Sequence, residues 1–177
     1  MVEVIYYVAT SLDGYIATSD GGVEWLGQFR ASEDDDSAGE FYASVDALLL
    51  GSHTYEFALK LGRWPSPDKP SWVFTSRRLR LLDPSITLTS QSPGEVIELL
   101  GSRSLHRAWL MGGGKLAASF HAAHLISRYM ITVLPIVLGS GIPVFAPHAS
   151  PLGRLRLVEA KPFKSGVVQL TYDGGLA

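Results

Sequence analysis

A glycine turn followed by a lysine is the clearest sign of chemistry in this sequence. Gly112–Lys115 follow the apolar run Ala108–Met111 and precede the helix-like run Leu116–Phe120. Glycines at this point let a ligand approach the backbone closely, and the free N–H groups of a helix start favour an anion. Lys115 adds a positive charge beside them. The turn therefore predicts a site for a phosphate or diphosphate; the alternative is a glycine-rich turn without a ligand.

The same residues fit the dinucleotide fingerprint Gly-x-Gly-x-x-Ala, through Gly112, Gly114 and Ala117. A Rossmann domain carries a carboxylate about 20 residues beyond these glycines, which holds the ribose. Here no Asp or Glu occurs between Gly112 and Val158, and too little chain follows the glycines for a second half of that fold. We therefore reject an ordinary Rossmann domain and keep the phosphate site.

Composition limits the class of protein. The 177 residues are 46% hydrophobic and 18% charged, which suits a single globular domain over residues 1–177 with a sizeable core. The net charge is −2, so nothing favours a nucleic-acid partner. No apolar stretch is long enough to span a bilayer, and Met1–Ile5 has the pattern of a strand rather than of a signal peptide. The absence of Cys excludes disulfides and thiolate catalysis, and we expect a cytoplasmic protein.

Strand and helix patterns alternate along the chain. Apolar β-branched runs predict buried strands at 2–8, 45–50, 72–75, 86–88, 107–111 and 126–134. Helices are expected at about 40–44, 53–61, 92–100 and from the glycine turn to about 123, with a long loop over 10–22. We expect Ser52 to cap the second helix and Gly62 to end it. Alternating residues at 155–161 and 167–172 predict a closing hairpin.

This order of elements predicts an α/β fold. Since strands alternate with helices to about residue 134, we expect three layers with a mostly parallel central sheet. The closing hairpin would add antiparallel strands at one edge of that sheet.

Four segments together resemble the dihydrofolate reductase-like superfamily, and within it the bacterial branch related to the reductase domain of riboflavin biosynthesis. The resemblance covers nearly the whole chain, with the segments in the family's order. They are Ala9–Ala17 (first strand and mobile loop), Leu50–Glu56 (a strand-to-helix turn that holds phosphate), Met111–Lys115 (the glycine turn) and Pro135–Phe145 (the loop before the closing hairpin). The resemblance implies the same fold and NADPH as hydride donor.

The resemblance also assigns residues to the coenzyme. It implies that Gly112–Lys115 lie under the diphosphate, with a cis peptide between Gly112 and Gly113. The other coenzyme residues it implies are Ala9, at the nicotinamide carboxamide; Gly51, Ser52, His53 and Thr54, at phosphates; and Thr75, Ser76, Arg77 and Arg78, at the adenosine 2′-phosphate. Arginine binds a phosphate dianion by charge and by paired donors, which would select NADPH over NADH. Without the resemblance, a solvated loop is an equal alternative for the two arginines.

The substrate side offers two candidate catalytic acids. Reducing a C=N bond needs hydride at carbon and a proton at nitrogen, which a carboxyl of raised pKa can supply. The resemblance places that acid near Asp35, whereas Glu33–Asp36 by itself favours a solvated helix start. Asp13 is near the mobile loop, although an Asp-Gly pair is more typical of a turn. His121 and His124 are three apart on a predicted helix; without Cys or a carboxylate nearby in sequence we expect no metal site.

These features predict an NADPH-dependent reductase of a small heterocycle or ribosylaminopyrimidine, similar to 5-amino-6-(5-phosphoribosylamino)uracil reductase. The chain departs from dedicated riboflavin reductases at Tyr55–Ala58, where those carry an Asp-Pro motif. Two alternatives therefore stay open: a dihydrofolate or pterin reductase, and a non-catalytic NADP-binding regulatory module that has lost the proton donor. We expect a small-molecule substrate, no nucleic-acid or membrane partner, and a homodimer, because relatives often pair through the sheet edge or closing segment.

Overall fold

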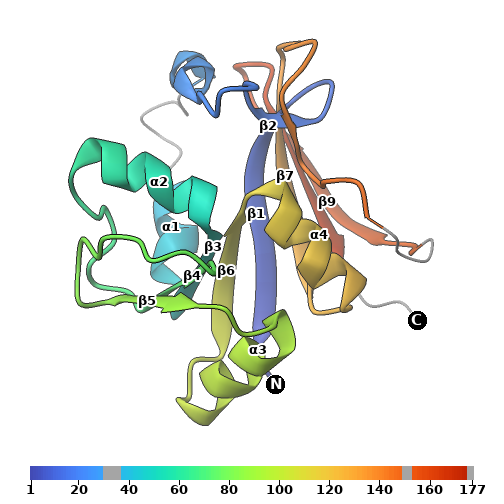
Figure 1. The fold of residues 1–177 in the computed structure, drawn as a ribbon. Helices are drawn as coiled ribbons and strands as arrows, with labels where there is room; N and C mark the ends of the chain where they lie inside the picture. The colour runs from blue at the N-terminus through green and yellow to red at the C-terminus, as the bar shows by residue number, and fades with distance from the viewer. Residues whose placement is uncertain (30–36, 149–152, 175–177) are drawn as a thin grey trace.

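One large sheet organises the molecule (Figure 1). The computed structural model describes residues 1–29, 37–148 and 153–174. The strands of the sheet are β1 (Glu3–Ser11), β3 (Ala47–Gly51), β4 (Ser71–Phe74), β5 (Ile86–Thr89), β6 (Arg107–Gly112), β7 (Arg128–Leu134), β9 (Arg156–Pro162) and β10 (Val168–Asp173). Their order is β5-β4-β3-β6-β1-β7-β10-β9. Neighbours from β5 to β7 are parallel, while β10 runs antiparallel to β7 and to β9, so the predicted mostly parallel sheet with an antiparallel edge is confirmed.

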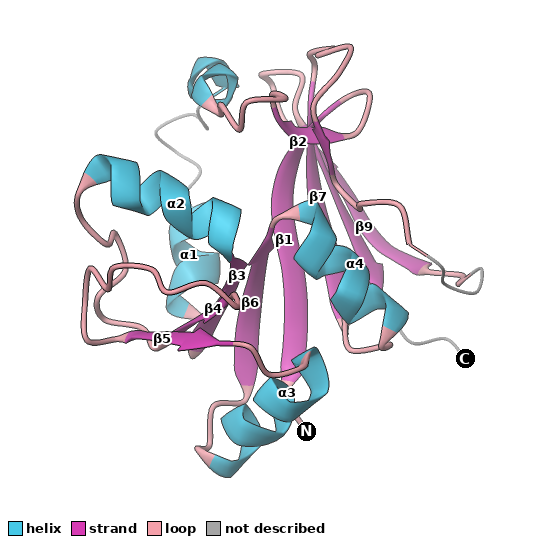
Figure 2. Ribbon diagram, viewed as in Figure 1, coloured by secondary structure: helices cyan, strands magenta, loops and turns pink. Residues whose placement is uncertain are grey.

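Helices cover both faces of the sheet and complete the three predicted layers (Figure 2). The helices are α1 (Ser37–Ala43), α2 (Ser52–Leu61), α3 (Pro93–Ser102) and α4 (Gly114–Ala122), with a 3-10 helix η1 at Glu24–Phe29. One core joins α3 and α4 to the face that carries Tyr6 and Leu110. The other core joins α1 and α2 to the face that carries Leu48 and Val73. Burial of these apolar faces is the main force that holds the layers together.

Local sequence signals set the ends of the helices. Ser92 caps α3: its side chain accepts from the N–H of Glu95, the Glu95 side chain accepts from the N–H of Ser92, and Pro93 begins the helix. Gly62 ends α2 in the left-handed conformation, with φ 71°, as predicted. The prediction that Ser52 caps α2 is wrong, because Ser52 is the first helical residue and the N-cap is the preceding glycine.

A second, two-stranded sheet lies where the sequence predicted only loops. It pairs β2 (Tyr15–Ala17) with β8 (Ile142–Pro143). A Cβ atom at Gly141 would lie 2.2 Å from the carbonyl oxygen of Ala17, so this pairing requires a glycine there. Strands of two or three residues carry too short a pattern to be recognised, because their pairing comes from contacts more than a hundred residues apart in the sequence.

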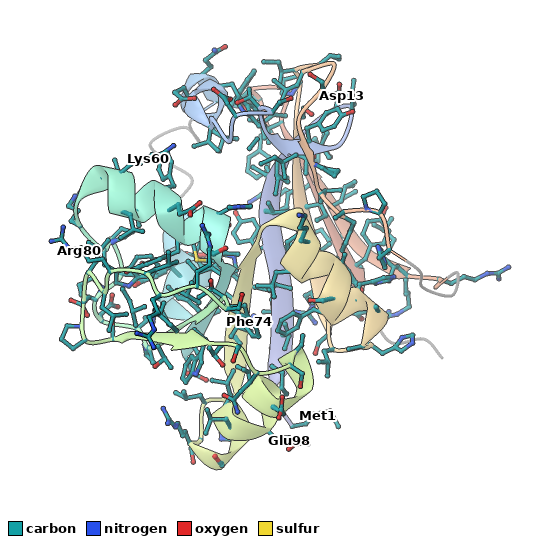
Figure 3. All side chains as sticks on the ribbon, in the orientation of Figure 1. Met1, Asp13, Lys60, Phe74, Arg80 and Glu98 are labelled. Carbon is teal, nitrogen blue, oxygen red and sulfur yellow. The ribbon has the colours of Figure 1, made fainter. Side chains whose placement is uncertain are left out.

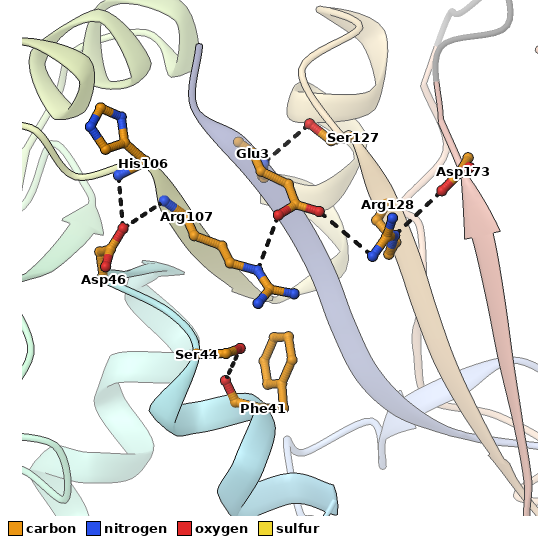
Figure 4. A network of polar contacts seen from close by, with 10 residues as sticks. Glu3, Phe41, Ser44, Asp46, His106, Arg107, Ser127, Arg128 and Asp173 are labelled. Carbon is orange, nitrogen blue, oxygen red and sulfur yellow. Dashed lines mark hydrogen bonds and ion pairs between the residues drawn. The ribbon is translucent and has the colours of Figure 1, made fainter.

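Charged residues at the amino-terminal edge of the sheet form a separate network (Figure 4). Glu3 contacts Arg107 at 3.1 Å and Arg128 at 3.7 Å. Asp46 accepts hydrogen bonds from the backbone N–H groups of His106 and Arg107, at 2.8 and 2.9 Å. These residues stand at the starts of β1, β6 and β7, so the carboxylates of this network bind neighbouring strand starts and lie at the end of the sheet away from the glycine turn.

Candidate functional site

Two adjacent parallel strands end side by side, and the helices that follow them diverge. β3 and β6 are neighbours, and Leu50 pairs with Gly112 at their carboxyl ends. After β3 the chain enters α2 and returns as β4 on one side; after β6 it enters α4 and returns as β7 on the other. Figure 1 shows α2 and α4 diverging from this point. In open α/β sheets such a switch point is where ligands bind, because the diverging helices leave a space above the strand ends.

The two helix starts that follow these strands lie close together. A Cβ atom at Gly51 would lie 3.7 Å from both the oxygen of Gly112 and the nitrogen of Gly113. Gly51 is the N-cap of α2 and Gly113 the N-cap of α4, and neither helix has a side-chain cap. The first N–H groups of both helices therefore have no acceptor within the helix and no capping side chain. We call this pair of helix starts, Gly51–Thr54 and Gly112–Lys115, the two-helix cradle.

The glycines of the turn have separate roles. Gly112 has φ 100°, which favours glycine, and the peptide between Gly112 and Gly113 is cis, as the resemblance implied. A Cβ atom at Gly113 would lie 3.7 Å from Cδ1 of Ile16 and 3.8 Å from Oγ1 of Thr54, so the predicted residue Thr54 faces the turn. The remaining predicted cradle residues include Lys115 and His53, which are exposed on the first turns of their helices.

Gly114 packs against a segment that sequence reasoning assigned to a loop. A Cβ atom there would lie 2.2 Å from the oxygen of Pro143. The oxygen of Gly114 accepts a hydrogen bond from the N–H of Ala146 at 3.1 Å, and the hydroxyl of Tyr6 donates to the oxygen of Val144 at 2.6 Å. We call residues 142–146 the strap. The strap explains why the third position of the turn must be a glycine, independently of any ligand.

Thr75, Ser76 and Arg77 follow β4, which neighbours β3 in the sheet. The N–H of Arg77 donates to Oγ1 of Thr75 at 3.0 Å. Nη1 of Arg77 contacts Oε1 of Glu56 on α2 at 2.7 Å. The arginine thus has a partner on the helix of the cradle, and sequence reasoning missed this pair because the two residues meet only through the β3–β4 pairing.

A cleft of about 250 Å³ opens beside α2. It is lined by Ser19, Asp20, Gly21, His53, Glu56, Phe57, Lys60 and Ile142. Of these residues only His53 was predicted as part of a site. Asp20, Glu56 and Lys60 give this lining charges of both signs, and a hydrogen bond from Thr18 lowers the pKa of Asp20, so that carboxyl stays ionised. The other lining residues carry no local sequence signal, since their contribution depends on the approach of the 19–21 loop to the helix.

The two candidate acids have different outcomes. Asp35 lies outside the described residues. Asp13, labelled in Figure 3, accepts hydrogen bonds from the N–H groups of Leu138 and Gly139, at 3.1 and 2.7 Å. A hydrogen bond from Ser11 and these two bonds lower the pKa of Asp13. A carboxylate held in its ionised form is a poor proton donor, so the geometry favours Asp13 as an anchor between two loops, a longer-range role than the local Asp-Gly turn of the sequence analysis.

Ala9 lies on β1, paired with Thr132, and is half-buried beside a small apolar cluster that includes Trp25, Leu134 and Val167. Its predicted backbone contact with a nicotinamide carboxamide stays a prediction. Within the described ranges, no three His, Cys, Asp or Glu side chains gather where they could hold a metal ion. Over the same ranges, none of the helices combines the length and apolarity that crossing a bilayer demands.

Known proteins with related sequences point to one family. The model of the RibD C-terminal domain matches residues 2–169. The chain is 36% identical over 171 residues to the uncharacterized protein YwjB of Bacillus subtilis (strain 168). The alignment covers 96% of this chain and 97% of that protein. It is 29% identical over 154 residues to the riboflavin biosynthesis protein RibD of Mycobacterium tuberculosis, but spans only 44% of that protein.

Solved structures agree with the sequence comparison. A provisionally named riboflavin biosynthesis protein from Shewanella sp. PV-4 superimposes with a TM-score of 0.85 at 26% identity, covering 99% of both chains. The bifunctional deaminase and 5-amino-6-(5-phosphoribosylamino)uracil reductase of Thermotoga maritima gives a TM-score of 0.74 at 17% identity over 57% of its length, which shows a shared fold. The resemblance to the dihydrofolate reductase-like fold is thereby confirmed, and this chain belongs to the RibD C-terminal domain family.

Proposed function

We propose that this chain is an NADPH-dependent reductase of a small heterocyclic or ribosylaminopyrimidine substrate. The observation that carries the proposal is the close approach of two helix starts without side-chain caps at the switch point of the sheet, where a Cβ atom at Gly51 would be in van der Waals contact with the Gly112–Gly113 peptide. Two helix N-termini that converge on one point favour a ligand with two adjacent negative charges, and a diphosphate is such a ligand.

The residues of the cradle fit a dinucleotide. The first N–H groups of α2 and α4 would hold the diphosphate, and Lys115 would add a charge at its side. Arg77, one strand away, would bind the adenosine 2′-phosphate. When bound, the coenzyme supplies the hydride, and the chain's own task is to fix its position against the substrate.

The substrate proposal rests on the family and on the cleft beside α2. The Thermotoga protein of the same fold is described as a reductase of a ribosylaminouracil. The cleft is lined by charged groups of both signs, Lys60 with Asp20 and Glu56, and by the imidazole of His53, which suits a polar heterocycle. Because Asp13 is held ionised by its hydrogen bonds, the geometry does not assign it the protonation of substrate.

Binding and turnover together test the proposal. Calorimetric titration of the purified protein should show micromolar binding of NADPH, weakened at least tenfold by Lys115→Ala together with Arg77→Ala. Lys164→Ala, in the turn between β9 and β10, is the matched control and should leave binding unchanged. Equal millimolar binding of NADPH and NADH would contradict the coenzyme assignment.

Turnover separates the possible roles. We expect the absorbance of NADPH to fall when the ribosylaminopyrimidine is added and to stay constant when dihydrofolate is added. Oxidation with dihydrofolate alone would instead identify a pterin reductase. Tight NADPH binding without oxidation by any substrate of a heterocycle panel would identify a binding module.

We also propose a homodimer that forms through the edge strand β9. All seven residues of this strand are exposed, Leu157 and Val158 among them, and β9 is the last strand of the sheet order. An exposed edge with apolar side chains is a common site of pairing between chains. Light scattering should give twice the mass of the chain, and Val158→Lys should reduce it.

A further inference from the structure

The ion pair between Arg77 and Glu56 has a consequence for coenzyme selection. Nη1 of Arg77 lies 2.7 Å from Oε1 of Glu56, and the side chains are 48% and 33% exposed. Glu56 stands on α2, one turn beyond the N–H groups of the cradle, and lines the cleft beside that helix. The guanidinium proposed to meet the 2′-phosphate is therefore already bound to a carboxylate of this chain.

The contact with Glu56 leaves Arg77 able to bind a phosphate, but it reduces the net electrostatic attraction between Arg77 and that phosphate. A guanidinium carries five N–H donors, and the Glu56 contact engages the Nη1 group, so other donors stay available. The charge of the carboxylate, however, cancels most of the arginine's field at a distance of a few ångströms. A phosphate dianion at the same guanidinium would lie close to the carboxylate and be repelled by it, whereas a ribose 2′-hydroxyl carries no charge to repel.

We propose that Glu56 weakens the preference of this chain for NADPH over NADH by offsetting the charge of Arg77. This inference rests on the proposed function, because it concerns the same coenzyme site. It makes Glu56 a specificity-determining residue, and it predicts that the wild-type chain discriminates between the two coenzymes less than a site with an unpaired arginine does.

Glu56→Gln isolates the effect of charge. A glutamine has nearly the same shape, and its side-chain oxygen can still accept from Arg77, so the arginine keeps its orientation while the negative charge is removed. The exposed pair contributes little to stability, and unfolding by heat should confirm that the variant folds as the wild type does. Two variants serve as controls. Glu56→Asp keeps the negative charge at this position, whereas Glu98→Gln removes a negative charge from α3. Figure 3 shows Glu98 near Met1 and away from Lys60 of α2.

The experiment is calorimetric titration of each variant with NADPH and with NADH. We expect Glu56→Gln to raise the ratio of NADPH to NADH affinity by about three- to tenfold, mainly through tighter NADPH binding. Glu56→Asp and Glu98→Gln should keep the wild-type ratio within twofold, and Arg77→Gln should lower it.

Two other outcomes separate the claims. A ratio for Glu56→Gln that stays within twofold of wild type, or that falls, overturns the role of Glu56 and leaves the reductase proposal standing, provided that the wild type binds NADPH. Failure of the wild type to bind either coenzyme overturns the proposed function, and this inference falls with it.

Discussion

Replacing Gly114 by alanine would drive a methyl group into the strap. The added Cβ atom would lie 2.2 Å from the oxygen of Pro143 and 3.2 Å from the nitrogen of Ala146, whereas ordinary contacts of a Cβ atom begin at 3.4 Å. Both neighbours are backbone atoms, so the strap must move by more than 1 Å. That movement breaks the hydrogen bond from Ala146 to Gly114 and strains the one from Tyr6 to Val144.

The expected loss follows from these contacts. Overpacking a well-packed site costs about 1–3 kcal/mol, and each hydrogen bond contributes about 0.5–1.5 kcal/mol. We therefore expect Gly114→Ala to lower the free energy of unfolding by about 2–4 kcal/mol. For a chain of 177 residues, this corresponds to a fall in Tm of about 5–15 °C.

Urea and thermal unfolding measure this effect, with Gly94→Ala as the matched control. A Cβ atom at Gly94, in the first turn of α3, would meet nothing within 4 Å, so this variant should be as stable as wild type or slightly more stable. A Tm of Gly114→Ala within about 1 °C of wild type would refute the packing role of the strap.

Three further predictions concern stability. Tyr6→Phe leaves the oxygen of Val144 without its donor in a buried site, and should lower the free energy of unfolding by about 1–2 kcal/mol in urea titrations. Ser92→Ala removes the capping box of α3 and should cost about 1 kcal/mol, which the same titrations detect and which Ser92→Asp should largely restore. Burial and two neighbouring histidines lower the pKa of His121. The stability that His121 contributes is therefore complete at a pH above its ordinary pKa of about 6.5, and it is lost as the pH falls through the lower pKa of the folded chain. Between pH 7.5 and 5, Tm should accordingly fall less for His121→Gln than for wild type, and an equal fall in both would contradict that assignment.

The long elements of the fold could be predicted from sequence because their signals are local. Apolar runs such as Ala47–Leu50 and capping residues such as Ser92 determine where strands and helices begin, whatever surrounds them. The glycine turn could be found for the same reason, since strand, glycines and helix follow one another directly in the chain.

The contacts that complete the candidate site could not be predicted in this way. Glu56 meets Arg77 only because β3 and β4 pair in parallel, and Asp13 meets Leu138 across 125 positions of sequence. The strap over Gly114 likewise depends on where the chain returns after β7, which no short window of sequence specifies. The glycine itself looked like part of a phosphate site, and only the position of Pro143 shows that packing also requires it.

Amide chemical shifts followed during titration with NADPH test the central claim most directly. If both helix starts bind the diphosphate, the backbone N–H signals of Gly51–Thr54 and Gly113–Lys115 should shift together, saturate at the same concentration, and exceed the shifts of α3 amides. Shifts confined to one of the two segments, or spread over the β9–β10 hairpin instead, would contradict binding by the two-helix cradle.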